Sequence, residues 1–595
     1  MSPAHPGALL LLGVICGRTG RWGEADRHLS LAVDAQPERE DALFWLAQVK
    51  RNLGQLQAAI ELCERALVVN PENPAVLNEL ALSYMAVDLP QACEVLRKAI
   101  QIDPASSYFH LNMGLALRRM SLLYPARLSL EEALRLNPDL TAAYFELAAV
   151  LELLGATKDA IEMLGTAVAR QQDNYQLAYL LAIAYSNDGN RDQAESVFRQ
   201  TLEIEPKSGN AFGFWLQQAG RFDESVGCFE VALKADPIQG AAFYGLAEAK
   251  AYRVDDKSLI SRATPVLDSL GPNLEEKAYL CYSLAAAYEH EKQFEEAMRH
   301  FDMANGFAYQ AYNAARSYEH AERKQQTDNE IALYNKEGLE VECQGSSLSV
   351  QPIFIVGMVR SGTTLLDQIV SRHSDVESAG EPVFWIQESD VLRRRGVTEL
   401  SAEELMDLST RYLAALEPFG RESQRITDKM PLNYGRLGLI HSVFPRAKVI
   451  HLRRNPLDTC LSIYTTFFGQ GPSFAYKQEN IVFNYLEYMR LMEHWRSILP
   501  QDKFLEIDYE ELVANQEPVV RKVLEFCDLP WQESCLHPGA NASAIRTPSV
   551  WQARQPVYNS SVQRWRRFGP WLGELAALQG IEHPPTRGKL APEPI

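Results

Sequence analysis

The chain has 595 residues, of which 46% are hydrophobic and 23% are charged. At roughly 100–200 residues per domain, this length predicts two to four domains rather than one compact core. A composition so close to the globular average excludes a largely disordered chain, a collagen-like repeat and a polytopic membrane protein.

The formal net charge of −19 is unevenly distributed along the chain. Residues 350–595 contain 27 Lys and Arg against 29 Asp and Glu, whereas the residues before 350 contain 31 against 48. The acidity therefore belongs almost entirely to the N-terminal part. A negative field of this size repels a phosphate backbone, so we expect no nucleic-acid partner.

Nine cysteines are spread thinly, with no C-x-x-C pair and no histidine at zinc-ligand spacing. This pattern is typical of free thiols in a reducing compartment, and it predicts no metal site. The apolar stretch 8–16 has no Lys or Arg before it and no small-residue cleavage site after it. No run reaches the ~18 apolar residues that a membrane-spanning helix needs. We therefore expect a cytoplasmic protein without a membrane span.

The N-terminal half is organised as a repeat. Prolines that close each unit recur at intervals of 34, 33, 34, 68 and 31 residues, at Pro37, Pro71, Pro104, Pro138, Pro206 and Pro237. Each unit carries small residues at matching offsets, such as Ala25 and Ala32 in the first unit. The spacing resembles the tetratricopeptide repeat, in which small residues let two antiparallel helices approach closely and a proline ends the second helix.

Each repeat buries its apolar face only against its neighbours, so we expect a right-handed superhelix with a concave groove over residues 6–310. The pattern leaves two functions open: the groove holds a peptide or partner, or the repeats only scaffold or oligomerise the chain. Units at about 206–277 depart from the pattern and predict irregular packing. Residues 311–349 lose the repeat and predict a linker helix.

The motifs that carry chemistry lie in residues 350–575. An apolar run at 352–357 is followed by a polar loop and then by helical spacing; the loop residues are Arg360, Ser361, Gly362, Thr363 and Thr364. Strand, loop and helix in this order are typical of a phosphate site, where N–H groups at the helix start hold the anion. A threonine in the lysine position of the triphosphatase loop disfavours a kinase or triphosphatase.

A second apolar run, 448–452, ends in two arginines where a triphosphatase would carry a magnesium-binding acid. Ser462 follows Arg454 by about two helical turns, so the arginine fork and the hydroxyl are able to grip one anion together. We interpret Arg454 and Ser462 as a site for a second phosphate of a bound nucleotide, one that is not part of its phosphate chain.

The segments 360–364 and 454–462 (R-N-P-x-D-x-x-x-S) resemble the two-part pattern of sulfotransferases that use 3′-phosphoadenylyl sulfate. Further segments are similar to those of tyrosylprotein sulfotransferases: 379–381, 428–431, 508–512 and 556–565. The chain as a whole resembles bacterial proteins that fuse tetratricopeptide repeats to such a domain. The resemblance implies an all-α repeat superhelix followed by an α/β P-loop-like domain with a parallel sheet over about 350–575. Residues 576–595 are expected to form a C-terminal tail.

The resemblance also implies roles for individual residues. Glu381 resembles the family's catalytic base, and Lys429 with Arg360 the cations that stabilise the transferred group and the leaving phosphate. The 5′-phosphate of the co-substrate would bind at residues 360–364. The residues implied around the rest of the nucleotide are Arg454 and Ser462 for the 3′-phosphate, Tyr509 for the adenine, and Ser549 and Arg564 for closure. No metal ion is required by this arrangement.

Four of these residues have ordinary alternatives. Glu381 is also explained as a capping or surface carboxylate, Lys429 as the partner of Asp428, and Tyr509 as a core aromatic with a hydrogen-bonded tip. Ser462 alone is an ordinary helix residue that gains meaning only from Arg454.

The acceptor is left open by the residues that follow Glu381. Tyrosylprotein sulfotransferases have basic residues there that help accept acidic peptides, whereas this chain continues Pro-Val-Phe-Trp. Protein tyrosine and the hydroxyl of a carbohydrate, lipid-linked or small phenolic acceptor all fit the same donor chemistry. The partner is thus a peptide, protein or glycan. A repeat adaptor that binds nucleotide without turnover is the alternative from another class, and the sequence leaves the oligomeric state open.

Overall fold

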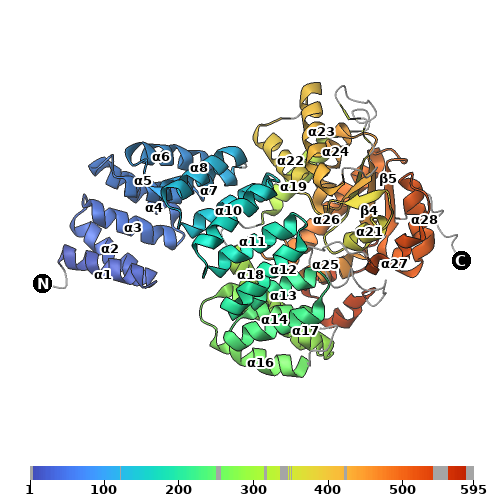
Figure 1. Cartoon of the computed structure of the whole chain (residues 1–595), viewed down its shortest axis with the longest axis horizontal. Coiled ribbons are helices and arrows are strands. Elements are labelled where there is room, and N and C mark those ends of the chain that lie inside the picture. Colours follow the sequence, from blue (N-terminus) through green and yellow to red (C-terminus); the bar gives the residue numbers. More distant parts are fainter. Residues whose placement is uncertain are drawn as a thin grey trace. The chain divides into compact units, whose positions relative to one another are not determined.

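The structure is a computed structural model that describes residues 5–120, 122–249, 256–313, 318–335, 346–347, 349, 351–397, 399–420, 425–540 and 561–584. The chain divides into two compact units, residues 1–205 and 206–595. Each unit has its own internal packing, and each is described separately below (Figure 1).

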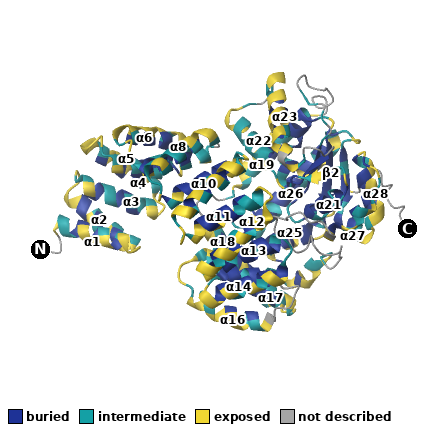
Figure 2. Cartoon of the chain, viewed as in Figure 1, coloured by how far each residue is buried: buried dark blue, intermediate teal, exposed yellow. Residues whose placement is uncertain are grey.

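The first unit consists of antiparallel helix pairs in chain order: α1 (Pro6–Arg18) with α2 (Trp22–Ala35), α3 (Glu40–Asn52) with α4 (Leu56–Val69), α5 (Pro74–Tyr84) with α6 (Leu89–Ile102), α7 (Ser107–Arg119) with α8 (Leu123–Leu136), α9 (Thr141–Leu153) with α10 (Thr157–Arg170), and α11 (Tyr175–Asn187) with α12 (Arg191–Ile204). Each predicted proline follows the second helix of a pair, and the connection after α10, at residues 171–174, has none. In Figure 2 these helices have buried inner faces and exposed outer faces.

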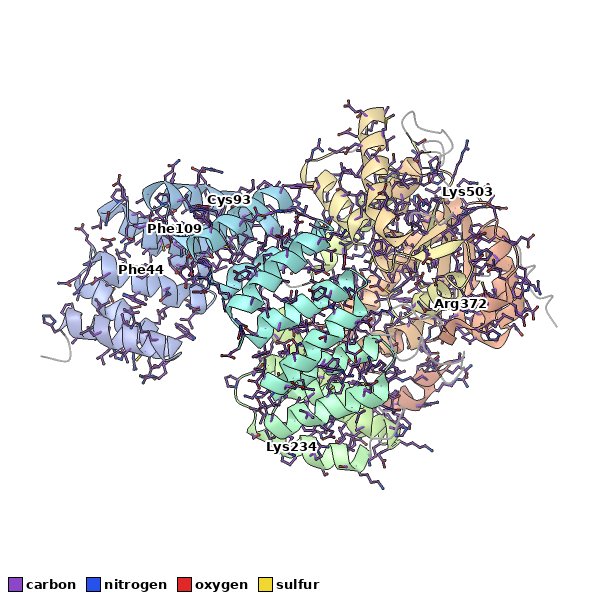
Figure 3. All side chains as sticks on the ribbon, viewed as in Figure 1. Phe44, Cys93, Phe109, Lys234, Arg372 and Lys503 are labelled. Atoms are coloured by element: carbon purple, nitrogen blue, oxygen red, sulfur yellow. The ribbon has the colours of Figure 1, made fainter. Side chains whose placement is uncertain are left out.

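Small residues set how closely the paired helices approach. A Cβ added at Gly114 of α7 would lie 2.5 Å from Cγ of Leu130 in α8, so only glycine fits there. The alanines predicted from the repeat, including Ala25 and Ala32, are fully buried. Neighbouring pairs share a core as well: Cys93 of α6 and Phe109 of α7, both labelled in Figure 3, belong to one hydrophobic cluster.

The second unit begins with further helices of the repeat region: α13 (Gly209–Gln218), α14 (Phe222–Ala235), α15 (Gly240–Glu248), α16 (Asp256–Ser269), α17 (Leu274–His290) and α18 (Phe294–Tyr312), followed by α19 (His320–Leu333). The irregularity predicted for 206–277 lies here. A 3₁₀ turn at Pro206–Ser208 precedes α13, and α13 and α15 are only 10 and 9 residues long.

The predicted α/β domain follows. In the described residues it contains an all-parallel five-stranded sheet in the order β2-β3-β1-β4-β5. The strands are β1 (Pro352–Val356), β2 (Val376–Ser378), β3 (Arg425–Asp428), β4 (Lys448–Arg453) and β5 (Phe504–Asp508). The helices are α21 (Thr363–Val370), α22 (Phe384–Arg394), α23 (Ala402–Leu416), α24 (Leu437–Val443), α25 (Pro456–Tyr464), α26 (Gln478–Ile498), α27 (Tyr509–Ala514) and α28 (Gln516–Phe526). The predicted fold class is confirmed.

Strand β1 is buried on both faces, as expected of a central parallel strand with helices on each side. Ile353 and Ile355 pack in a cluster with α21 and α28, while Phe354 and Val356 pack in a larger cluster on the other face. The larger cluster also contains Tyr282 of α17 and other residues of α17 and α18. The last helices of the repeat region therefore share one core with the sheet domain.

The region expected as a C-terminal tail from residue 576 differs from that expectation in its described part. Leu578 is buried, and His583 lies within hydrogen-bond distance of the Arg454 carbonyl at 3.2 Å and the Tyr485 hydroxyl at 3.0 Å. Residues up to 584 thus pack against the sheet domain, because apolar side chains such as Leu578 are part of its hydrophobic core. Among the described residues, no helix is long and apolar enough to cross a membrane.

Candidate active site

The loop after β1 approaches its neighbours so closely that two positions need glycine. A Cβ at Gly357 would lie 2.5 Å from the Leu452 carbonyl oxygen and 2.8 Å from Oγ of Ser361. Gly362 has a φ of 102°, and a Cβ there would lie 2.5 Å from the Tyr509 ring. The loop is therefore pressed between β4 and Tyr509, and it leads directly into α21.

The hydroxyls at the start of α21 suit an anion. Ser361, Thr363 and Thr364 are buried beside the N-terminus of this helix, where backbone N–H groups and the helix dipole favour negative charge. Oγ of Ser361 is buried and has no hydrogen-bond partner among the described residues. A buried hydroxyl without a partner is costly unless a ligand supplies one.

The two predicted arginine sites lie next to each other. Nε of Arg360 donates to Oγ of Ser462 at 3.2 Å, and Nη1 of Arg454 donates to the Arg360 carbonyl at 3.0 Å. Arg454 is buried, and its Nε has no hydrogen-bond partner within the described part of the chain. The structure thus brings Arg360, Arg454 and Ser462 into one cationic cluster, although 102 residues separate the first from the last.

The R-N-P motif forms the junction between β4 and α25. Arg454 comes directly after the strand, the side chain of Asn455 caps the helix by accepting from the Asp458 N–H at 3.1 Å, and Pro456 is the first helical residue. Ser462 then lies two turns along the same helix. Local capping chemistry therefore explains why Arg454 and Ser462, the two residues predicted to bind one anion, lie at the same edge of the sheet.

Tyr509 begins α27 at the end of β5 and is largely buried. The Arg454 guanidinium lies 5.0 Å from its ring centroid, and its hydroxyl hydrogen-bonds Oγ of Ser561 at 2.9 Å. Both sequence interpretations, an adenine-facing ring and a core aromatic with a bonded tip, agree with this position.

Glu381 and Lys429 meet where neighbouring strands β2 and β3 end. Nζ of Lys429 lies 2.5 Å from Oε1 of Glu381, and the Lys429 N–H donates to the Gly380 carbonyl at 2.8 Å. The lysine side chain is 2% exposed and the glutamate side chain 36%. Lys429 therefore pairs with Glu381 rather than only with its neighbour Asp428, and Glu381 keeps one face open to an incoming group.

Two buried carboxyls hold this region together. Sequence reasoning missed Asp367, and it named Asp428 only within the 428–431 motif and as a partner of Lys429. Asp367 of α21 accepts from Thr427 Oγ1 at 2.6 Å and from Ser378 Oγ at 2.8 Å, which ties the phosphate-loop helix to the ends of β3 and β2. Asp428 accepts from the Tyr412 hydroxyl at 2.7 Å. Burial raises the pKa of Asp367, and it raises the pKa of Asp428 to about 7. An acid placed mid-helix in an apolar stretch was the available signal for Asp367.

Arg564, predicted to close over the nucleotide, makes a fork-to-fork ion pair with Glu289 of α17, at 2.7 and 2.6 Å. Its Nη1 also donates to Oγ1 of Thr465 at 3.0 Å. The structure thus places this arginine against the repeat region. Ser549, the other residue expected to take part in closure, lies outside the described residues.

Comparison with known families agrees with this geometry. Residues 352–533 match the family model described as Sulfotransferase family, and residues 40–83 and 154–212 match Tetratricopeptide repeat models. The chain carries tetratricopeptide repeats and a sulfotransferase family domain. The family in general uses 3′-phosphoadenylyl sulfate as its donor. The unpartnered Ser361 hydroxyl and Arg454 Nε fit the phosphates of such a donor.

Relatives support the same assignment at a distance. An uncharacterized protein of Aquifex aeolicus (strain VF5) is 29% identical over 373 residues, covering 60% of this chain and 48% of its own. A protein-tyrosine sulfotransferase of Drosophila melanogaster is 27% identical over 239 residues, covering 36% and 46%. Sulfotransferase 2B1 of Mus musculus is 26% identical over 216 residues, covering 35% and 58%. The chain thus spans about half the length of these curated relatives, and it is distantly similar to protein-tyrosine sulfotransferases.

Proposed function

We propose that the sheet domain transfers a sulfuryl group from 3′-phosphoadenylyl sulfate to the hydroxyl of a protein tyrosine. The observation that carries this proposal is the Glu381–Lys429 pair at 2.5 Å, on the same sheet edge as the cluster of Arg360, Arg454 and Ser462. A carboxylate beside a buried ammonium, next to a cradle for phosphates, supplies what a sulfuryl transfer to a hydroxyl needs.

The residues divide the work as follows. Residues 360–364 and the start of α21 bind the 5′-phosphate, and Arg454 with Ser462 binds the 3′-phosphate. The acceptor's hydroxyl oxygen bonds to sulfur, and Glu381 accepts the proton that this hydroxyl loses. The bond between sulfur and the phosphate oxygen breaks with its electron pair on that oxygen, which leaves adenosine 3′,5′-bisphosphate. Lys429 and Arg360 offset the charge on the leaving oxygen and the sulfonate.

Substitution Glu381→Gln tests the base directly. We expect transfer from radiolabelled donor to fall by about 10²–10⁴-fold, because the proton loses its acceptor. Calorimetric binding of adenosine 3′,5′-bisphosphate should stay within about threefold of wild type. The matched control is Glu388→Gln, which removes a carboxylate of α22 that pairs with Arg411 of α23 and should leave transfer intact.

Normal turnover in the Glu381 variant would remove the role assigned to this residue. A wild-type protein that binds the bisphosphate but never transfers sulfate would instead support the nucleotide-binding adaptor.

The residues after Glu381 favour an alternative to protein tyrosine as the acceptor. Phe384 and Trp385 pack with Tyr412 in an aromatic cluster instead of presenting basic side chains to an acidic peptide. This favours the hydroxyl of a carbohydrate or small phenolic molecule as the alternative acceptor. The repeats would bind the acceptor or a partner protein, since such repeats typically bind peptides, and we propose the cytoplasm as the location.

Mass spectrometry for added sulfate on proteins and glycans of the source cell, with and without this protein, distinguishes the two acceptor classes. Sulfated tyrosines that disappear without the protein support the first. Sulfated glycans or phenolic metabolites that disappear, with tyrosines unchanged, support the second.

A further inference from the structure

Residues 561–571 form a segment, here called the strap, that is attached at one end to the candidate nucleotide site. Nη2 of Arg454 donates to the Ser561 carbonyl at 2.7 Å, and the Ser561 hydroxyl meets that of Tyr509. The carboxylate of Asp458, a buried residue of α25, accepts from the N–H groups of Gln563 at 2.6 Å and Trp565 at 2.9 Å. The strap thus bonds directly to residues that we assign to phosphate and adenine binding.

The other end of the strap is attached to the repeat region. Arg564 places both arms of its guanidinium on the Glu289 carboxylate, and each of these two side chains is only 19% exposed. Four residues on, the fully buried Phe568 meets Phe294 of α18 edge-on, with ring centroids 5.3 Å apart. A bidentate, partly buried arginine–carboxylate pair is among the strongest polar contacts available to a protein.

Helix α18 also supports the helix that carries Ser462. Asp302 of α18 accepts from the Tyr464 hydroxyl at 2.6 Å, and the side-chain amide of Asn305 donates to the Tyr464 carbonyl at 2.9 Å. Tyr464 is the last residue of α25. Helices α17 and α18 therefore hold both structures that border the candidate 3′-phosphate site, namely α25 and the strap.

We propose that Glu289 is a positioning residue for the donor nucleotide: by fixing Arg564 it holds the strap against Arg454 and Tyr509. The last helices of the repeat region then set the affinity for 3′-phosphoadenylyl sulfate. This inference rests on the proposed function of the sheet domain. Glu289 itself does not touch the reacting atoms and acts through Arg564.

The test is calorimetric titration of the full chain with adenosine 3′,5′-bisphosphate. Glu289→Gln keeps the size of the side chain but removes its charge, so the dissociation constant should rise about tenfold. Glu289→Asp should recover most of the affinity. The matched control is Glu230→Gln, which removes a comparable pair with Arg262, at 2.8 and 2.9 Å, between α14 and α16 and should leave binding unchanged.

Steady-state kinetics separate positioning from general loss of structure. In Glu289→Gln the KM for the donor should rise about tenfold while the acceptor KM stays at its wild-type value. Wild-type affinity or tighter binding in Glu289→Gln overturns the inference while leaving the proposed function intact. A rise in both KM values together with early thermal unfolding overturns it too. If the wild-type chain fails to bind the bisphosphate, the proposed function falls and the inference with it.

Discussion

The first unit and the sheet domain bury different kinds of side chain. In residues 1–205 the buried positions are mostly alanines and leucines, and a buried carboxylate such as Glu79 is paired with Arg51 at 2.5 Å. At the strand ends of the sheet domain, by contrast, Asp428, Lys429 and Arg454 are all buried. Burying charge is unfavourable unless partners or ligands offset it. The contrast agrees with repeats that depend on close helix packing and with the functional site that we propose at the sheet edge.

Within the repeat region itself, the helices before and after residue 205 also differ. Helices α1–α12 pack with their neighbours in the first unit, whereas α17 and α18 share a core with the sheet domain. The last helices of the repeat region thus stabilise the sheet domain as well as each other.

The largest effect that would sharpen this comparison is expected at the sheet edge. Arg454→Ala should weaken binding of adenosine 3′,5′-bisphosphate by roughly 100-fold, or about 2.7 kcal/mol. The reason is that the variant lacks the buried guanidinium that we propose binds the 3′-phosphate. Calorimetry measures the loss of affinity. Arg135→Ala serves as the control and should bind normally, because Arg135 is an exposed residue of the first unit that pairs with Glu132 of the same helix at 2.6 Å. Equal affinity in both variants would place the 3′-phosphate elsewhere.

A packing change should affect the repeats most. Gly114→Ala forces a methyl group against Leu130 and should destabilise the first unit by about 1–3 kcal/mol. Gly165→Ala, in α10, meets nothing within 4 Å and should be neutral or stabilise by about 0.5–1 kcal/mol. Hydrogen–deuterium exchange across α7 and α8, with thermal unfolding, distinguishes them. If both variants unfold alike, close helix approach does not limit the stability of this unit.

A third expected effect is a change in how the free energy of unfolding depends on pH. Because burial raises the pKa of Asp428 to about 7, against about 3.9 in an unfolded chain, the folded state holds a proton that the unfolded state releases. This contribution is fully present below pH ~4 and is lost as pH rises toward about 7, by up to about 1.4 kcal/mol per pH unit.

Asp428→Asn should remove this slope, so the free energy of unfolding of wild type should fall relative to the variant between pH 4 and 7. Denaturant titrations at several pH values measure the difference. The exposed Asp159, substituted in the same way, is the control. Parallel curves for wild type and Asp428→Asn would show that Asp428 ionises alike in both states.

Much of the fold follows from local spacing. The helix pairs could be predicted because each repeat contacts its sequence neighbours, so the period of alanines and prolines is also the period of the structure. The loop at 360–364 and the β4–α25 junction could be predicted as well. In each case a strand, a loop and the start of a helix lie within one short segment.

Other parts of the site could not be predicted from spacing. The Lys429–Glu381 pair joins residues 48 positions apart, and Arg564 meets Glu289 across 275 positions. The contact between Asp367 and Thr427 likewise depends on two strands and a helix being assembled first. No local pattern encodes which of many carboxylates a buried cation will meet.

The amino-acid sequence by itself determined the repeat region, the parallel sheet and the residue types suited to a phosphate, because these depend on neighbours along the chain and on side-chain chemistry. Only the tertiary structure decided that Arg360, Arg454 and Ser462 form one cluster and that Arg564 turns to the repeats. The physical reason is that parallel strands bring their carboxyl ends to one edge whatever their order in the chain. The partners of a buried charge are then selected by packing rather than by sequence distance.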